Sequence, residues 1–220
     1  MHNSRKHANS KSRRPYPTTF FRDILLSRIL RIFDAMIYPI VAYGDPVLKK
    51  EAEEIDEKYP RLKNLIVSMY ETMSKANGVG LAAPQIGLSI RIFIIDASAF
   101  AEDHPELKGY RKTFINPIIV EEAGIKYEFN EGCLSIPGIR EDINRQPEVV
   151  VEYFDEKFNL KEEKFNGIPA RIIQHEYDHL EGILFTDLVS PFKKKLLKGK
   201  LSDISKGKVD VDYRMKFYKK

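Results

Sequence analysis

The sequence predicts an α+β domain in which antiparallel sheets pack around a central helix that carries an HExxH motif. One further helix precedes it toward the N-terminus and another follows near the C-terminus. Three observations support this fold class. Strand-like runs are joined by short turns, and apolar residues recur at helical spacing between residues 62 and 73. The run Asn166 to Pro169 then opens the HExxH helix, because proline is tolerated in the first turn.

The length and composition fit one globular domain. The chain has 220 residues, of which 43% are hydrophobic and 31% charged. Its net charge of +4 is unevenly distributed, because residues 1–35 carry +6 and the remainder carries −2. The body of the chain therefore has no charge signature of a DNA-binding protein. A single cysteine excludes an internal disulfide.

Residues 1–35 form a basic N-terminal extension. We expect residues 1–19 to be disordered, since they contain almost nothing that could form a core, while residues 20–36 could form an amphipathic helix. Two interpretations are open: the extension is dispensable and Met36 is the true start, or it is an organelle-type presequence. The longest uncharged run nearby, residues 35–44, is too short to span a bilayer, so we expect no membrane association.

The compact domain is expected to begin at residue 36 with extended apolar residues and a turn at Gly44-Asp45-Pro46. The first helix, over residues 62–73, should end at Asn77-Gly78. The expected strands are 90–96, 112–120, 125–130, 148–155 and 158–165. A last helix is expected near residues 191–203. We expect the catalytic domain to span residues 36–200 and residues 201–220 to form a lysine-rich tail.

The stretch QHEYDHLEG, residues 174–182, predicts a metal site. His175 and His179 are four residues apart, so on a helix both imidazoles lie on one face and can bind one divalent ion. Glu176 would stand beside the metal, free to move protons. The alternative is a solvated helix face in which the pattern arose by chance. The apolar residues that accompany the motif favour the metal site, because they would bury the helix against a core.

A third protein ligand is required, and no histidine follows His179. The candidates are His104, Cys133 and a carboxylate. His104 lies in a polar loop typical of an exposed residue. Cys133 follows a strand within the small-residue run NEGCLSIPG, where a buried inert cysteine is the alternative. Together with the HExxH motif, a Cys/His/His site is the more economical interpretation. A zinc endopeptidase would instead take a downstream ligand such as Asp187.

Three stretches together resemble the signature motifs of the peptide deformylases: GVGLAAPQ (78–85), EGCLS (131–135) and HEYDHLEG (175–182). The resemblance covers residues 36–200, and no motif position departs from the family pattern. It implies hydrolysis of the N-formyl group from the initiator methionine of nascent polypeptides, with release of formate. It also implies one divalent ion per chain held by Cys133, His175 and His179. Fe²⁺ is the expected ion, with Zn²⁺ or another divalent ion as the alternative.

The resemblance also implies roles for other residues. Glu176 would act as general base and then general acid, while the Gln85 side chain and the Leu134 backbone N–H would donate to the oxyanion. Gly78 can end the preceding helix, and Gly80 allows close approach of a peptide backbone. The candidate substrate-binding residues are Gly78, Val79, Gly80, Gly132, Ile172 and Arg140. Glu131 and Asp178 are open to either a site role or a structural ion pair.

The expected partners are N-formylmethionyl nascent peptides. Five clustered lysines could also contact ribosomal RNA near the exit tunnel, although a solvated helix face is the ordinary interpretation. They are Lys193, Lys194, Lys195, Lys198 and Lys200. We expect a cytoplasmic bacterial monomer, with organellar import through residues 1–35 as the alternative. The alternative functions are a zinc-dependent HExxH endopeptidase and a non-catalytic, ribosome-associated metal-binding module.

Overall fold

The computed structural model describes residues 36–219. The disordered segment expected at residues 1–19 and the helix expected at 20–36 lie outside the described residues, apart from Met36. The helices are α2 (Leu62–Lys75), α3 (Gly167–Leu180), α4 (Phe185–Leu188) and α5 (Pro191–Ser205). The 3-10 turns are η2 (Pro46–Lys49), η3 (Ala83–Ile86), η4 (Ala97–Phe100) and η5 (Pro105–Leu107). The strands are β1 (Ile40–Val41), β2 (Gly80–Ala82), β3 (Ile92–Asp96), β4 (Arg111–Ala123), β5 (Tyr127–Cys133), β6 (Ile136–Arg145), β7 (Glu148–Phe154), β8 (Leu160–Asn166) and β9 (Met215–Lys216).

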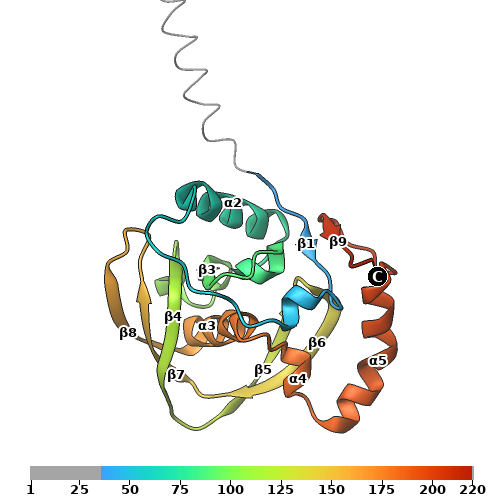
Figure 1. Ribbon diagram of the computed structural model, residues 1–220. Coiled ribbons are helices and arrows are strands. Elements are labelled where there is room, and N and C mark those ends of the chain that lie inside the picture. The colour runs from blue at the N-terminus through green and yellow to red at the C-terminus, as the bar shows by residue number, and fades with distance from the viewer. Residues whose placement is uncertain (1–35, 220) are drawn as a thin grey trace, which may run out of the picture. The chain divides into compact units, whose positions relative to one another are not determined.

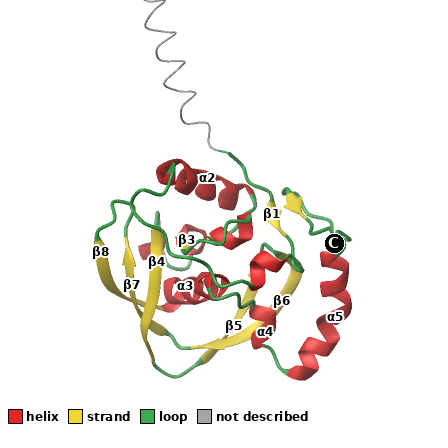
Figure 2. Ribbon diagram, in the orientation of Figure 1, coloured by secondary structure: helices red, strands yellow, loops and turns green. Residues whose placement is uncertain are grey.

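The strands form antiparallel sheets, as the sequence predicts, together with one parallel pair. The larger sheet has the order β2-β3-β4-β7-β8, and β5 and β6 form a separate antiparallel pair. The short strands β1 and β9 pair in parallel. All five expected strands and the three expected helices are present, and Figure 2 shows helices and strands packed together in an α+β arrangement. The strands at 112–120 and 125–130, although consecutive, belong to different sheets.

The alternation of residues in β7 positions one face of the larger sheet against α3. Its buried residues are Val149, Val151 and Tyr153, every second position. Phe114 lies at the centre of this face, with its ring centroid 4.6 Å from that of Phe93 and 4.5 Å from that of Tyr153. Helix α3 packs on the sheet through contacts with β2, β3, β7 and β8 (Figure 1). The motif helix is therefore fixed by a hydrophobic core.

The start of α3 follows the sequence signals. Asn166 is extended, Gly167 has a φ of 57°, and Pro169 occupies the first turn, where its missing N–H leaves no hydrogen bond unmade. The Gly167 N–H donates to the Pro147 carbonyl at 3.0 Å. This bond ties the beginning of the helix to the β6–β7 connection. Among residues 36–219, no helix combines the length and apolar character needed to cross a membrane.

Candidate active site

The two histidines of the HExxH motif lie one above the other on α3. The ring centroids of His175 and His179 are 5.2 Å apart. Both residues are buried: His175 is 9% exposed and His179 is 1% exposed. This follows from their four-residue spacing, which places both on the same helix face. Burial removes the alternative of a solvated helix face for these two residues.

Cys133 joins the two histidines from the end of β5. Its Sγ lies 3.3 Å from Nε2 of His179, and the sulfur and one nitrogen of each histidine all lie within 4.8 Å of one another. A register shift in the β5–β6 pairing falls between Gly132 and Cys133, so the strand pattern is broken where the cysteine turns to the helix. One thiol and two imidazoles form a donor set that suits Zn²⁺ or Fe²⁺, and the residues fit a divalent ion.

The other candidate ligands lie elsewhere. His104 precedes η5 in an exposed loop, where its Nδ1 is 3.4 Å from Glu106. Asp187, the ligand that an endopeptidase interpretation would need, caps the start of α4 by accepting from the Leu184 N–H at 2.7 Å. It also forms an exposed ion pair with Lys49. Among the described residues, the only cluster of three or more potential ligands is that of Cys133, His175 and His179.

A buried ion-pair network orients His175. Glu131 Oε2 lies 2.9 Å from Nδ1 of His175, and because an ionised carboxylate only accepts, Nδ1 carries the proton. Nε2 is then left free to bind a metal. Arg145 donates to both oxygens of Glu131 at 2.8 and 3.0 Å and also to Asp178. Arg171 Nη1 lies 3.4 Å from Glu131.

The network includes Glu131 and Asp178, two residues whose role the sequence leaves open. Glu131 contacts His175 directly, whereas the Asp178 side chain contacts Arg145, which in turn contacts Glu131. Burial raises the pKa of Glu131, but hydrogen bonds from His175 and Arg145 outweigh it and bring the pKa to about 2. Sequence reasoning missed Arg145 and Arg171, because their pairing with Glu131 is made by tertiary contacts that leave no local pattern in the sequence.

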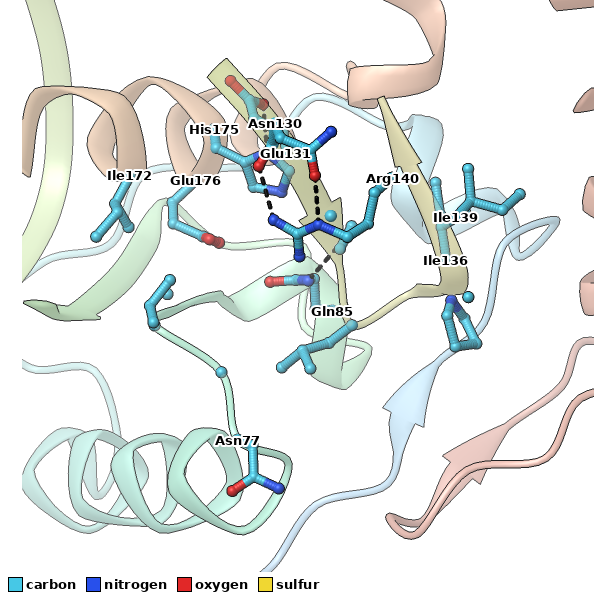
Figure 3. A pocket seen from close by; sticks show the side chains of 18 of the residues that line it. Asn77, Gln85, Asn130, Glu131, Ile136, Ile139, Arg140, Ile172, His175 and Glu176 are labelled. Atoms are coloured by element: carbon cyan, nitrogen blue, oxygen red, sulfur yellow. Dashed lines mark hydrogen bonds and ion pairs between the residues drawn. The ribbon is translucent and has the colours of Figure 1, made fainter. Parts of the chain in front are cut away.

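Glu176 faces the cavity beside the histidines. The residue is 4% exposed, and burial, the largest effect, raises the pKa of its carboxyl to about 7. Its Oε2 is buried with no hydrogen-bond partner among the described residues. Figure 3 shows Glu176 and His175 projecting from α3 toward Gln85. The carboxylate is thus held where it can exchange a proton with a small molecule in the cavity.

Gln85 and Leu134 both lie next to the cysteine. The Oε1 of Gln85 accepts from the Ala82 N–H at 2.8 Å, which points Nε2 toward Cys133, 3.4 Å from its Sγ. Leu134 follows Cys133 directly, and its carbonyl accepts from the hydroxyl of Tyr213 at 2.8 Å. The three sequence motifs, far apart in the chain, therefore meet at one place.

A cavity of about 510 Å³ opens onto these residues. All of the candidate substrate-binding residues line it: Gly78, Val79, Gly80, Gly132, Ile172 and Arg140. Glu176, Gln85, Leu134, Cys133 and His175 also line it, while His179 does not. Arg140 is held by Asn130, through its side-chain oxygen and its carbonyl, each at 2.7 Å. Several lining residues were not expected from the sequence: Asn77, Phe100, Phe129, Ile139, Asp210 and Tyr213.

An HExxH helix joined by a cysteine, with a free carboxylate at the edge of a cavity, is the arrangement of a metal-dependent hydrolase. Comparison with known proteins agrees with this class. The family model described as Polypeptide deformylase matches residues 37–195. The peptide deformylase of Christiangramia forsetii is 56% identical over 189 residues, covering 83% of this chain and 96% of that protein.

Solved structures show the same similarity. A crystal structure of Plasmodium falciparum peptide deformylase matches with a TM-score of 0.69 and 36% identity, covering 76% of this chain and 95% of that one. A Met-Ala-Ser-bound class I type b peptide deformylase from Acinetobacter baumannii matches with a TM-score of 0.64 and 33% identity. That match covers 70% of this chain and 99% of the other. The chain belongs to the peptide deformylase family.

The activity of the family is the hydrolytic removal of the N-formyl group from nascent polypeptides, and it is the activity of this protein. The expectation drawn from the three sequence motifs is thereby confirmed. An HExxH endopeptidase and a non-catalytic metal-binding module are the less supported alternatives.

Proposed function

We propose that Cys133, His175 and His179 hold one divalent ion and that Glu176, Gln85 and Leu134 act on the formyl group. The observation that carries this proposal is the convergence of one sulfur and two imidazole nitrogens within 4.8 Å, beside a buried carboxylate at the edge of the cavity. When bound there, such an ion supplies Lewis acidity toward the formyl carbonyl and toward water. Fe²⁺ remains the expected ion, although the donor set also suits Zn²⁺.

In the proposed mechanism, Glu176 moves the proton. Its carboxylate lies at the cavity surface on the turn between the two histidines, with one oxygen free of any described partner. There it accepts the proton of the attacking water and passes it to the leaving amine. Burial of the side chain limits the access of bulk water. Helix α3, which carries Glu176 and contacts four strands, is in this proposal the element around which the site is organised.

The developing oxyanion is stabilised by two donors. The Gln85 amide is oriented by the bond from the Ala82 N–H to its Oε1, so Nε2 is the end that faces the site. The second donor is the backbone N–H of Leu134, the residue that follows Cys133. Donors that are already in place need no reorganisation when charge develops, which is why fixed amides are effective in this role.

The methionine side chain of the substrate occupies the apolar part of the cavity. Val79, Leu134 and Ile172 line this part, and the glycines at 78, 80 and 132 leave room for a peptide backbone. The similar structure from Acinetobacter baumannii contains Met-Ala-Ser, a peptide of the kind that deformylation releases. We therefore assign the same cavity to formyl-Met peptides in this protein, with Arg140 near the peptide.

The catalytic domain is proposed to span residues 36–200, and residues 1–35 to be dispensable. A monomer in the bacterial cytoplasm stays a prediction. Contact with the ribosome is a further prediction, supported by the exposed positions of Lys194, Lys195, Lys198 and Lys200 on α5. Lys193 is paired with Glu141 at 2.7 Å. We expect the chain to co-sediment with ribosomes in a salt-sensitive way and to lose this co-sedimentation when the four exposed lysines are replaced by glutamate. Co-sedimentation that persists after the replacement would contradict the contact.

The enzymatic proposal is tested by formate release from formyl-Met-Ala-Ser. The wild-type chain is expected to release formate, to lose this activity with a chelator and to regain it with Fe²⁺ or Zn²⁺. Glu176→Gln is expected to keep the metal, measured by elemental analysis, and to lose at least about 100-fold in kcat, the low end of general acid–base contributions. Glu176→Gln with most of the wild-type rate would overturn the assignment of the proton carrier. A Glu57→Gln variant, changed on the exposed surface, is the matched control.

A further inference from the structure

The chain beyond α5 passes along the cavity. We define residues 206–217 as the C-terminal segment; it lies outside the match to the family model, which ends at residue 195. The segment begins directly after α5, and its second residue, Gly207, has a φ of 75° that suits a glycine after a helix. Four consecutive residues then line the cavity: Asp210, Val211, Asp212 and Tyr213. The sequence alone predicts only a lysine-rich tail here.

The C-terminal segment is held in place on both sides of these residues. Downstream, β9 pairs with β1, where the N–H groups of Ile40 and Ala42 donate to the carbonyls of Arg214 and Lys216 at 2.8 and 2.9 Å. Figure 1 shows β9 lying beside β1. Upstream, the Lys208 N–H donates to the Asp203 carbonyl of α5 at 2.9 Å. Two anchored ends restrict the movement of the four residues between them.

Tyr213 connects this segment to the EGCLS motif. Its hydroxyl donates to the Leu134 carbonyl at 2.8 Å, and its ring packs in the same core cluster as Leu134. The next carbonyl, that of Ser135, accepts from the Tyr43 N–H at 2.8 Å. Two successive carbonyls that follow Cys133 are therefore held, one by the C-terminal segment and one by the chain just after β1.

The side chain of Leu134 is confined from the other direction. A β-carbon at Gly78 would lie 2.8 Å from its Cδ1, so the leucine already fills the space beside the GVGLAAPQ motif. The hydrogen bond from Tyr213 to the carbonyl and the close approach of the side chain to Gly78 together restrict the orientation of the Leu134 backbone. A backbone donor contributes to catalysis only when it is held within about 0.5 Å of the productive position.

We propose that Tyr213 is a positioning residue for deformylation, which holds the Leu134 backbone in the orientation that presents its N–H to the formyl oxygen. The proposal rests on the role proposed above for Leu134. Among the described residues, no hydrogen bond joins Tyr213 to Cys133, His175 or His179, and it acts through the hydrogen bond that its hydroxyl donates to the Leu134 carbonyl. The C-terminal segment is accordingly part of the catalytic unit and extends it past the boundary at residue 200.

The test compares Tyr213→Phe with the wild type in the metal-loaded full chain. The variant removes one hydroxyl and keeps the ring, so the packing in the core cluster is retained. We expect kcat for formyl-Met-Ala-Ser to fall about five-fold, the effect of one hydrogen bond of ordinary strength. The Kd of Met-Ala-Ser should be unchanged, because this product lacks the formyl oxygen. Tyr218→Phe, at an exposed tyrosine near the end of the chain, is the matched control.

The possible outcomes distinguish a positioning role of Tyr213 from a role in shaping the cavity wall. A fall in kcat with unchanged Met-Ala-Ser affinity and metal content supports the positioning role. An unchanged kcat overturns it, and so does a parallel loss of Met-Ala-Ser affinity, which would indicate that Tyr213 only shapes the cavity wall. Amide hydrogen exchange over residues 132–136 is a second measurement: faster local exchange is expected in Tyr213→Phe, and unchanged exchange counts against the proposal. A wild-type chain that releases no formate would instead refute the proposed function.

Discussion

Gly80 and Glu176 are so close that a β-carbon on Gly80 would lie 2.3 Å from Oε1 of Glu176 and 2.7 Å from its carboxyl carbon. Both residues are buried, Gly80 in β2 and Glu176 in α3. The absence of a side chain at residue 80 therefore sets where the carboxylate can lie. The glycine belongs to one sequence motif and the glutamate to another, and their contact links the two across the cavity.

Gly80→Ala is expected to displace the Glu176 carboxylate and to lower kcat about 100-fold, the effect of moving a catalytic group by roughly 1 Å. The added methyl group has no space unless Glu176 shifts, and α3 is fixed in the core. Steady-state formate release and elemental analysis of the metal would check this. Gly199→Ala is the matched control, because a β-carbon there meets no atom within 4 Å. An active Gly80→Ala would show that the carboxylate tolerates another position.

Glu131→Gln is expected to weaken metal binding by about 10- to 100-fold, because the carboxylate that fixes the His175 tautomer is lost. The change also removes one of the two carboxylates that pair with the buried Arg145, and the free energy of unfolding should fall by up to about 3–5 kcal/mol. Chelator competition and denaturant unfolding measure the two effects. Glu128→Gln, an exposed residue in the same strand, should change neither. Equal metal affinity in both variants would show that Glu131 does not support metal binding through His175.

Metal loading is expected to stabilise the folded chain. An ion present at 100 times its Kd adds about 2.7 kcal/mol, which raises the Tm of a domain of this size by roughly 5–10 °C. Differential scanning calorimetry with and without chelator would measure the shift. Cys133→Ala should abolish it, whereas His104→Ala should keep it, since His104 is paired with Glu106 in an exposed loop. A shift that persists in Cys133→Ala would place the ion elsewhere.

The ion pair of Asp96 and Arg111 predicts a defined pH dependence of stability. Burial raises the pKa of Asp96, but hydrogen bonds from Ser98 and Arg111 outweigh it, so the folded-state pKa lies below its ordinary value. The stabilisation is therefore present above the unfolded-state pKa of about 3.9 and is lost as pH falls through the lower folded-state value. Asp96→Asn should cost about 0.5–1 kcal/mol at pH 7.

The difference in the free energy of unfolding between wild type and Asp96→Asn should disappear as the pH falls below the folded-state pKa of Asp96. Urea unfolding at a series of pH values would measure this change. Asp56→Asn, at an exposed aspartate without such an ion pair among the described contacts, provides the control. A constant difference between Asp96→Asn and wild type at every pH would mean that the carboxylate charge is not the cause. Because the Asp96 N–H also donates to the Val79 carbonyl at 2.8 Å, activity should be measured alongside stability.

Much of the fold could be predicted from periodicity. Every second residue of β7 is apolar and buried, and the helical spacing of apolar residues from Leu62 to Met73 corresponds to α2. Strand β6 was not predicted, because its residues 136–145 mix one proline, one glycine and several charged side chains with few apolar ones. Its place is set by pairing with β5 over most of its length. The pairing of β1 with β9 joins two-residue strands, which are too short to give a periodic signal.

The sequence by itself determined the chemistry of the site: two histidines at one-turn spacing with a glutamate between them, a lone cysteine, and the motifs that define the family. Local spacing fixes those properties, because a helix places residues four apart on one face whatever surrounds it. Only the tertiary structure decided which groups support them: Glu131 with Arg145 behind His175, Gly80 against Glu176, and Tyr213 on Leu134. These contacts join residues far apart in the chain, and packing of the whole core brings them together.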